Sequence, residues 1–424
     1  MAALGALSST GFAKPIEEAI KGVDTSGYLR YRYDGDEWEN RGGMKNGTPN
    51  SEAKHKYRAL ANLKIPVATG MAFNLGALYI NENATANTSG SSTGTGLGAG
   101  EDGDFGVSSY FMSFTPESTK TTLKVGKQLL DTPLTDASDF DRGTGIYALS
   151  SDIPNWTFAF GAFDTFALAD VHRYGSDALP NSSITEAFYV AGAMAKYDAL
   201  SAGAWYYRVK NLMDSAIYAN LDYEMGLSEG MGLGISLAYA RNEIYQKASL
   251  WHAGAKRNDL YKAQIDVNVD PIRFAVGYLG NSADGYSVAF DSNAKGLITP
   301  MNMGQLWWQN SYTGIRFSPF LGSGIKVEGN QRDALSVLYA NFAWDITDSV
   351  RVLLIGVGGK AELDRGSGIP KYTREFIEIT PMAEYKHTEN LSFLAHHAML
   401  QTKVARISLK EYRNRFRFQA LYRF

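Results

Sequence analysis

Apolar and polar side chains alternate with a period of two along most of this chain. The clearest case is residues 261–269, in which the odd positions are apolar or aromatic and the even positions are polar. The same alternation in residues 29–34 places aromatic and aliphatic side chains on one face and two arginines and an aspartate on the other. This period is typical of β-strands with one apolar face.

The alternating segments are about ten residues long, which is the length that a tilted strand needs to cross a bilayer. An even number of antiparallel strands is typical of single-chain bacterial barrels. The expected strands, about eighteen, are residues 25–34, 55–66, 71–80, 105–114, 121–129, 143–150, 156–163, 188–197, 201–210, 216–225, 233–241, 260–269, 272–281, 334–344, 350–358, 374–385, 391–400 and 412–424.

The connections between these segments alternate between short and long. Residues 116–120 and 386–390 are short connections, whereas 81–104 and 282–333 are long ones. Short periplasmic turns and long external loops give this alternation in outer-membrane barrels. The segment 282–333 contains "QLWWQN", and its aromatic content predicts that it folds over the barrel mouth or a neighbouring subunit.

The width of such a barrel decides which face meets water. A lumen bounded by about eighteen strands is too wide to be filled by wall side chains. An apolar unfilled lumen is unstable in water, so we expect apolar side chains to meet lipid and polar ones to line a water-filled pore. The predicted fold is therefore all-β, a transmembrane antiparallel barrel with an inward-folded third extracellular loop. A soluble sandwich array or a solenoid is the alternative, but no repeat of 20 to 50 residues recurs.

Composition narrows the function classes. The 424 residues carry a formal net charge of -3, which gives no global basic surface for nucleic acid. Cysteine is absent, which excludes disulfides, thiol catalysis and thiolate metal sites. No apolar run approaches the ~20 residues of a membrane helix. The 25 tyrosines and 21 phenylalanines suit an all-β chain with aromatic bands.

The N-terminal residues differ in composition from the rest. Residues 1–13 are small and apolar, like the remnant of a secretory signal peptide, although a disordered N-terminus is the alternative. We assign residues 14–24 to a periplasmic N-terminal segment and residues 25–424 to the transmembrane barrel, with 131–143 as a constriction loop.

Closure of the barrel brings the last strand beside the first. The polar faces of strands 412–424, 25–34 and 55–66 are then expected to form one cationic pore wall. The alternative is that these like charges line the polar lumen by chance. The residues predicted for this wall are Arg30, Arg32, Arg58, Lys64, Arg415, Arg417 and Arg423, with Arg413 beside them.

The third long loop is rich in carboxylates. The residues expected at the pore constriction are Asp131, Asp136, Asp139, Asp141 and Arg142. Facing an arginine wall, they would create a transverse field that sorts solutes by charge and dipole. A solvated outer loop that uses aspartate in its turns is the alternative. Asp136, Asp139 and Asp141 are also candidates for binding Ca²⁺, although their spacing matches no EF-hand loop.

The final ten residues, "RFRFQALYRF", alternate between aromatic and cationic positions. Tyr422 and Phe424 are expected in the periplasmic aromatic girdle. The terminal Phe424 resembles the signal by which the barrel-assembly machinery recognises outer-membrane clients, so these two residues are candidates for an assembly signal.

One long segment and several short ones resemble a known family. Residues 14–34, "KPIEEAIKGVDTSGYLRYRYD", resemble the mature N-terminus of the major outer membrane porins of the Campylobacter and Helicobacter group. "HKYRA" (55–59), "GKQ" (126–128), "TD" (135–136), "GTG" (143–145) and "QALYRF" (419–424) follow in the family's order. The resemblance implies an 18-stranded trimeric porin in the outer membrane, with passive diffusion of small hydrophilic solutes and some preference for cations. It also implies roles as surface antigen and adhesin, although the loops 81–104 and 282–333 depart from the family.

The sequence therefore predicts a porin that is not an enzyme and requires no cofactor, with lipid and small hydrophilic solutes as partners. The resemblance implies two further copies of the chain as additional partners. A substrate-specific channel and an adhesin or antigen acting through the long loops are the alternatives. The six histidines lie in no catalytic motif such as G-x-S-x-G or H-E-x-x-H.

Overall fold

The computed structural model describes residues 22–39, 50–81, 104–168, 184–245, 255–290, 294–309, 313–320, 332–364, 371–404 and 409–424. Residues 1–13, predicted to be a signal-peptide remnant, and most of the segment 14–24 lie outside this part of the chain. Among the described residues, no helix is both long enough and apolar enough to cross a membrane.

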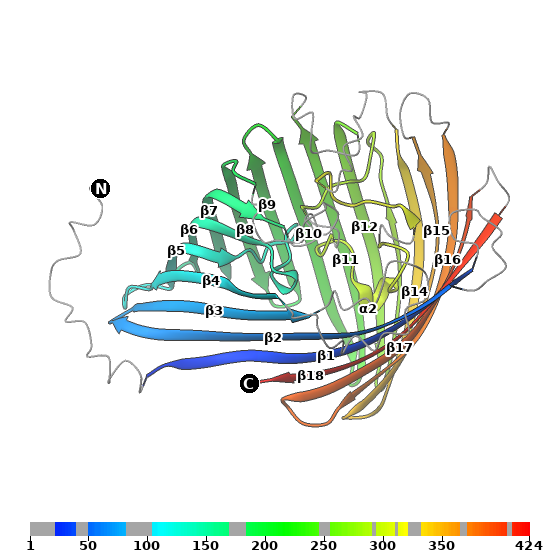
Figure 1. The fold of residues 1–424 in the computed structure, drawn as a ribbon, viewed down its shortest axis with the longest axis horizontal. Helices are drawn as coiled ribbons and strands as arrows, with labels where there is room; N and C mark the ends of the chain where they lie inside the picture. Colours follow the sequence, from blue (N-terminus) through cyan, green and yellow to red (C-terminus); the bar gives the residue numbers. More distant parts are fainter. Residues whose placement is uncertain are drawn as a thin grey trace.

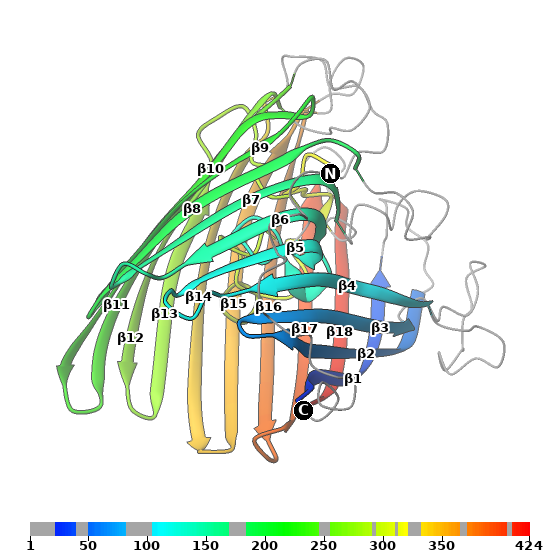
Figure 2. The same ribbon diagram turned by 90° about the vertical axis from the view of Figure 1, so that its left-hand side faces the viewer.

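Eighteen antiparallel strands form one closed sheet, as the sequence predicted (Figure 1). The strands are β1 (Asp24–Glu39), β2 (Asn50–Ala68), β3 (Met71–Asn81), β4 (Asp104–Phe114), β5 (Thr121–Leu129), β6 (Arg142–Ser150), β7 (Trp156–Ala167), β8 (Phe188–Tyr197), β9 (Leu200–Val209), β10 (Met213–Ser228), β11 (Met231–Ile244), β12 (Arg257–Val269), β13 (Ile272–Gly280), β14 (Ala334–Thr347), β15 (Val350–Leu363), β16 (Tyr372–Lys386), β17 (Leu391–Val404) and β18 (Leu409–Arg423). Each corresponds to one expected segment. In Figure 2 the strand direction turns from nearly horizontal in β1 to β4 to nearly upright in β11 to β16, which is the twist of a closed sheet.

The sheet closes between β1 and β18. Their register runs from Tyr28 opposite Arg423 to Glu39 opposite Tyr412. At the end of the seam, the Gly27 N–H donates to the Phe424 carbonyl at 3.0 Å, and the Phe424 N–H donates back at 3.2 Å. The last residue of the chain therefore completes the hydrogen bonding of the seam.

Side chains alternate between the outside and the lumen along each strand. In β14, Leu338 is 62 % exposed and points outward, whereas its neighbours Val337 and Tyr339 are buried. The outward faces of β10 to β16 carry mainly large apolar side chains, as a lipid-facing surface requires.

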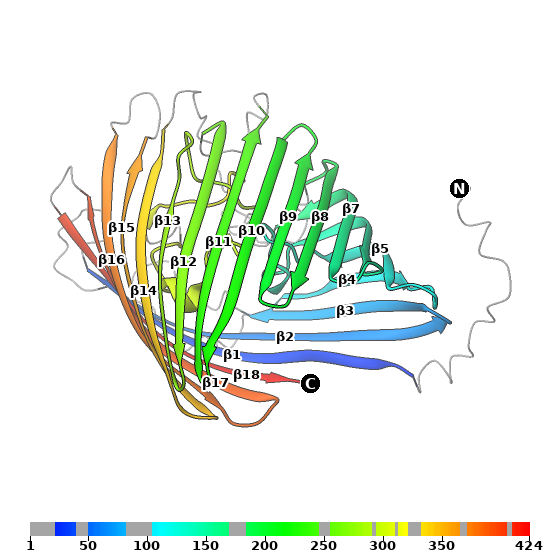
Figure 3. The same ribbon diagram turned by 180° about the vertical axis from the view of Figure 1, so that it is seen from behind.

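A long inward segment corrects one expectation. Polar side chains were expected to line the lumen throughout, but the inner faces of β14, β15 and β16 present Val337, Ile355 and Phe376, all buried. The connection between β13 and β14, which contains α2 (Pro300–Met303), covers them from inside the barrel. Figures 1 and 3 view the molecule from opposite sides, and in both α2 lies within the outline of the sheet. The described part of this connection thus packs inside the lumen, not over the mouth.

The third long loop also folds inward, between β5 and β6. It contains the short 3-10 helix η2 (Ala137–Asp139), and its Leu134 is fully buried. Leu134 accepts a hydrogen bond from the Phe290 N–H at 3.0 Å, and Pro133 accepts one from the Gly296 N–H at 2.8 Å. The two inward segments therefore support one another in the lumen.

Gly27 tests the closure. A Cβ at this position would collide with the backbone carbonyl of Leu60 and lie 2.8 Å from the Phe424 ring, so we expect Gly27→Ala to lower the yield of folded barrel. Heat-modifiable gel migration measures that yield. Gly358→Ala is the control, because a Cβ there meets nothing within 4 Å. Equal folded fractions of the two variants would contradict the close packing of Gly27 against β2 and the Phe424 end of the seam.

Candidate pore and its charged walls

The predicted basic wall is assembled on β18, β1 and β2, which are neighbours in the sheet. Two carboxylates of β1 lie among its arginines. Arg415 donates two hydrogen bonds to Asp36, at 2.9 and 2.8 Å, and Arg417 donates two to Asp34, at 2.5 and 2.9 Å. Lys56 also lies 2.9 Å from Asp34, whose side chain is fully buried. Part of the cationic charge is therefore compensated within the wall.

The remaining predicted wall residues lie along the same three strands. Arg30 is opposite Arg58 in the register of β1 and β2, and Lys64 is opposite Asp24 near the short-turn end. Arg32 donates to the Gln419 side-chain oxygen at 3.1 and 2.9 Å. Arg423 is exposed next to the end of the chain.

Arg58 connects the basic wall to the third loop. Its guanidinium lies 4.9 Å from the centre of the Phe140 ring and donates to the Ser138 carbonyl at 3.1 Å. Asp139 is 3.6 Å from the same guanidinium. The loop is thus held against β2 by one buried arginine through a cation–π contact, a hydrogen bond and an ion pair.

The five predicted constriction residues occupy different environments. Asp136 accepts hydrogen bonds from the Ser138 N–H and hydroxyl at 2.9 and 2.7 Å, and Asp141 accepts one from the Asp136 N–H at 2.7 Å. These two carboxylates shape the loop backbone. Asp131 forms an ion pair with Lys295 of the inward segment, and Arg142 donates to the Phe140 carbonyl at 3.1 Å.

The calcium hypothesis finds no support in this geometry. Within the described ranges, no three carboxylate or histidine side chains are grouped closely enough to hold a metal ion. Asp136 and Asp141 already accept the hydrogen bonds that fold the loop.

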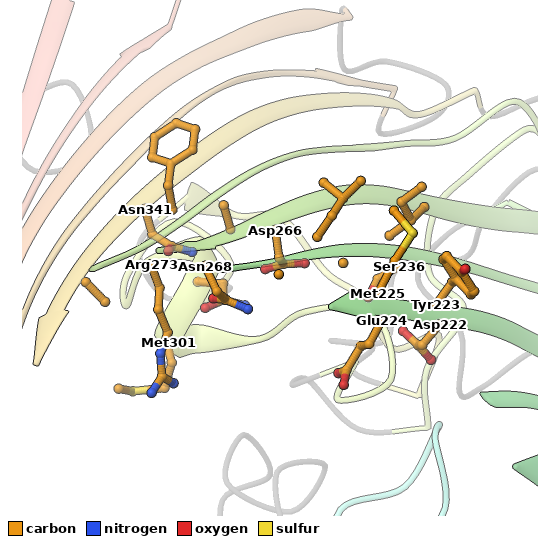
Figure 4. A pocket seen from close by; sticks show the side chains of 18 of the residues that line it. Asp222, Tyr223, Glu224, Met225, Ser236, Asp266, Asn268, Arg273, Met301 and Asn341 are labelled. Atoms are coloured by element: carbon orange, nitrogen blue, oxygen red, sulfur yellow. The ribbon is translucent and has the colours of Figure 1, made fainter. Parts of the chain in front are cut away.

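A water-accessible cavity of about 910 Å³ opens in the lumen near the short-turn end of β10 to β15 (Figure 4). We call it the vestibule. Asp222 and Glu224 of β10 and Asp266 of β12 line one side, and Arg273 of β13 lies toward the other. Met301 of α2 also lines it, so the inward segment forms part of its boundary.

The two signs of charge in the vestibule are paired differently. Arg273 donates to Asp345 at 2.9 Å, and Arg351 donates to Asp345 at 2.5 Å and lies 3.8 Å from Glu384. Both arginines are therefore matched by carboxylates.

The three carboxylates on the other side have no such match. Asp222 accepts a hydrogen bond from Asn220, and Asp266 accepts two from Gln264. Among the residues described here, neither of them nor Glu224 forms a salt bridge, and Lys262 on the same face of β12 offsets only part of their charge. The vestibule is consequently electronegative.

These three acids were not among the site residues predicted from the sequence. Their signal was present, because Asp222, Glu224 and Asp266 occupy the polar faces of two expected strands. Bringing them together requires the register of β10, β11 and β12, in which Asp222 is opposite Ser236 and Asp266 is opposite Gly234. Alternation alone does not give that register.

The two C-terminal aromatics lie where the sequence placed them, on the outer face at the short-turn end. The rings of Tyr422 and Phe424 stack with centroids 6.3 Å apart, and both are exposed.

Comparison with known proteins identifies relatives of this chain. The family model described as Campylobacter major outer membrane protein matches residues 1–424. No curated protein matches the chain. Many solved structures share its fold.

Three of these structures illustrate the likeness. Acinetobacter baumannii OccAB1 is 14 % identical, with a TM-score of 0.65 over 95 % of this chain and 97 % of that one. The Pseudomonas aeruginosa outer membrane protein OprD is 15 % identical, with a TM-score of 0.61 over 94 % and 93 %. Pseudomonas aeruginosa OpdK, solved with vanillate, is 12 % identical, with a TM-score of 0.62 over 95 % and 99 %.

Asp34 tests the internal compensation of the basic wall. Replacing it by alanine leaves Arg417 and Lys56 without their buried partner, which is expected to cost about 3 kcal/mol of stability. The temperature at which the folded band disappears on a gel measures the loss. Glu362→Gln, which removes an exposed carboxylate paired with Lys360, should change that temperature little. Equal effects of both substitutions would show that the Asp34 pairs add no stability.

Proposed function

The chain belongs to the Campylobacter major outer membrane protein family, and we propose that its outer-membrane channel passes ions and small hydrophilic solutes by passive diffusion, with a weak preference for cations. The family and the barrel fold support the location in the outer membrane and the function as a channel. The solute class and the ion preference are our proposal.

The proposed cation preference rests on the unequal pairing of arginines and carboxylates in the vestibule. Its arginines are matched by Asp345 and Glu384, whereas Asp222, Glu224 and Asp266 form no salt bridge among the described residues. A ring or cluster of carboxylates around a pore raises the local concentration of cations and lowers that of anions. Water in the vestibule and salt outside weaken this effect, which fits a weak preference.

The second element of the proposal is a transverse field beside the third loop. Arg58 and the other cations of β1, β2 and β18 line one wall, and the loop brings Asp139 against them. We propose that Asp131 and Asp139 present charge to passing solutes. Asp136, Asp141 and Arg142 would act through the shape of the loop.

A substrate-specific channel is the second candidate function. Two inward segments occupy much of the lumen, and the vestibule they leave holds both a carboxylate side and the half-exposed Arg273. That arrangement suits a dipolar solute. OpdK, which has a similar fold, was solved with vanillate, and this likeness supports the candidate function. Saturation of conductance by one solute would favour this candidate.

Other predicted partners remain proposals. We propose a homotrimer, and recognition of the C-terminal strand by the barrel-assembly machinery through Tyr422 and Phe424. The antigen and adhesin roles depend on the long loops, much of which lies outside the described residues.

Neutralising the vestibule tests the cation preference. In the triple variant Asp222→Asn, Glu224→Gln, Asp266→Asn, the reversal potential in a salt gradient should move toward the anion side, because the uncompensated carboxylates are gone. Planar-bilayer recording measures it. Glu375→Gln is the control, since this carboxylate lies on the outer face of β16 near Lys403. An unchanged reversal potential in the triple variant would reject the vestibule as its origin.

The trimer has a simple test. Unheated protein extracted in mild detergent should migrate as a species of about three chains and convert to the monomer on boiling, as expected for a closed symmetric oligomer. A monomer band that does not change with heating would contradict it.

A further inference from the structure

One buried carboxylate has no part in the pore walls described so far. Glu378 lies on the inner face of β16, and its side chain is fully buried. Among the described residues, no lysine, arginine or histidine pairs with it. A buried carboxylate without a cation is costly unless hydrogen bonds satisfy its oxygens.

Backbone N–H groups of the inward segment satisfy both oxygens of Glu378. Oε1 accepts the Gln305 N–H at 2.5 Å, and Oε2 accepts the Leu306 and Trp307 N–H groups at 2.9 and 2.8 Å. The Thr380 hydroxyl donates to Oε1 at 2.8 Å. Three consecutive N–H groups thus surround one carboxylate, which is a backbone nest that binds an anion supplied by the wall.

The residue that precedes the nest fits this arrangement. Gly304 has φ +86°, a conformation that favours glycine. A Cβ at this position would lie 2.8 Å from the nearer carboxylate oxygen of Glu378. The chain therefore approaches the wall as closely as a residue without a side chain permits.

Side-chain hydrogen bonds connect the nest to α2. The Gln305 side chain donates to the Pro300 carbonyl at 3.0 Å, and the Trp308 indole donates to the Gly304 carbonyl at 2.9 Å. The first bond reaches α2 itself, and the second reaches Gly304 at its C-terminal end. Met301 and Asn302 of α2 line the vestibule. A displacement of the nest would move these two residues and change the open space beside them.

We propose that Glu378 is the positioning residue of the inward segment and thereby sets the width of the passage past α2. The proposal rests on the channel function proposed above. The competing explanation is that apolar packing alone holds the segment, since Trp307 stacks on Phe376 with centroids 5.2 Å apart and an interplanar angle of 7°. Apolar packing holds the inward segment against the wall, whereas the hydrogen bonds of the nest fix the position of this segment along the wall.

A cysteine reporter separates the two explanations, because the chain contains no native cysteine. Met301→Cys is introduced alone and together with Glu378→Ala, and its reaction with a small thiol reagent is followed in purified protein in liposomes. In the double variant, three buried N–H groups lose their acceptor. We expect severalfold faster modification of the introduced thiol, and single-channel steps that are larger and less uniform.

Matched variants complete the test. Glu375→Gln removes a carboxylate from the outer face of the same strand and should change neither readout. Gly304→Ala keeps Glu378 but crowds its oxygen, and should reproduce the faster modification even where Glu378→Ala fails to fold. If Glu378→Ala or Gly304→Ala matches Glu375→Gln in both readouts, apolar packing alone positions α2 and the proposal is wrong. The thiol readout does not depend on solute or ion preference, so failure of the proposed function would be distinguishable.

Discussion

Every backbone N–H and C=O group inside a bilayer must find a partner within the protein, because lipid offers none. A sheet meets this requirement only when its first and last strands pair. The seam between β1 and β18 does so up to the final residue, where Phe424 and Gly27 exchange two hydrogen bonds. Once the sheet closes, side chains alternate between lipid and lumen, and the residues of β18, β1 and β2 are brought to one wall.

Closure with eighteen strands creates a second constraint, because the lumen is wider than wall side chains can fill. This protein fills part of it with its own connections. A hydrogen bond between Phe290 and Leu134 joins the connection between β13 and β14, which contains α2, to the third loop. The aromatic and aliphatic side chains of these two connections cover apolar stretches of β14 to β16. An apolar core inside a membrane barrel is the result. The water-filled path is restricted to what these segments leave, including the vestibule.

The carboxylates divide into those that hold the structure in place and those that we propose act on solutes. Carboxylates with several hydrogen bonds, such as Asp34, Asp136 and Glu378, hold strands and loops in place. Carboxylates with neither a cationic partner nor several hydrogen bonds among the described residues, such as Glu224, are the ones that we propose act on solutes. A residue's position on the polar face of a strand therefore does not by itself reveal which task it has.

The strands and the arginine wall could be predicted from sequence because both depend on a local period of two and on closure. The inward path of the connection between β13 and β14 could not be predicted. In the sequence, an apolar residue that faces a covering loop cannot be told from one that faces lipid. A signal did exist in β15, where Leu353 and Ile355 face inward while Leu354 faces outward, so both faces are apolar. Such a run indicates burial on two sides. The pairing of Arg417 with Asp34 depends on cross-strand register and side-chain conformation, which alternation does not specify.

We propose that this barrel is a water-filled channel whose vestibule carries an uncompensated negative charge. Recording the unmodified protein in a planar bilayer under a salt gradient tests it most directly. We expect stable openings, conductance that rises with salt without saturating, and a reversal potential on the cation side that shrinks as salt increases. Absence of openings, or a reversal potential on the anion side, would contradict it.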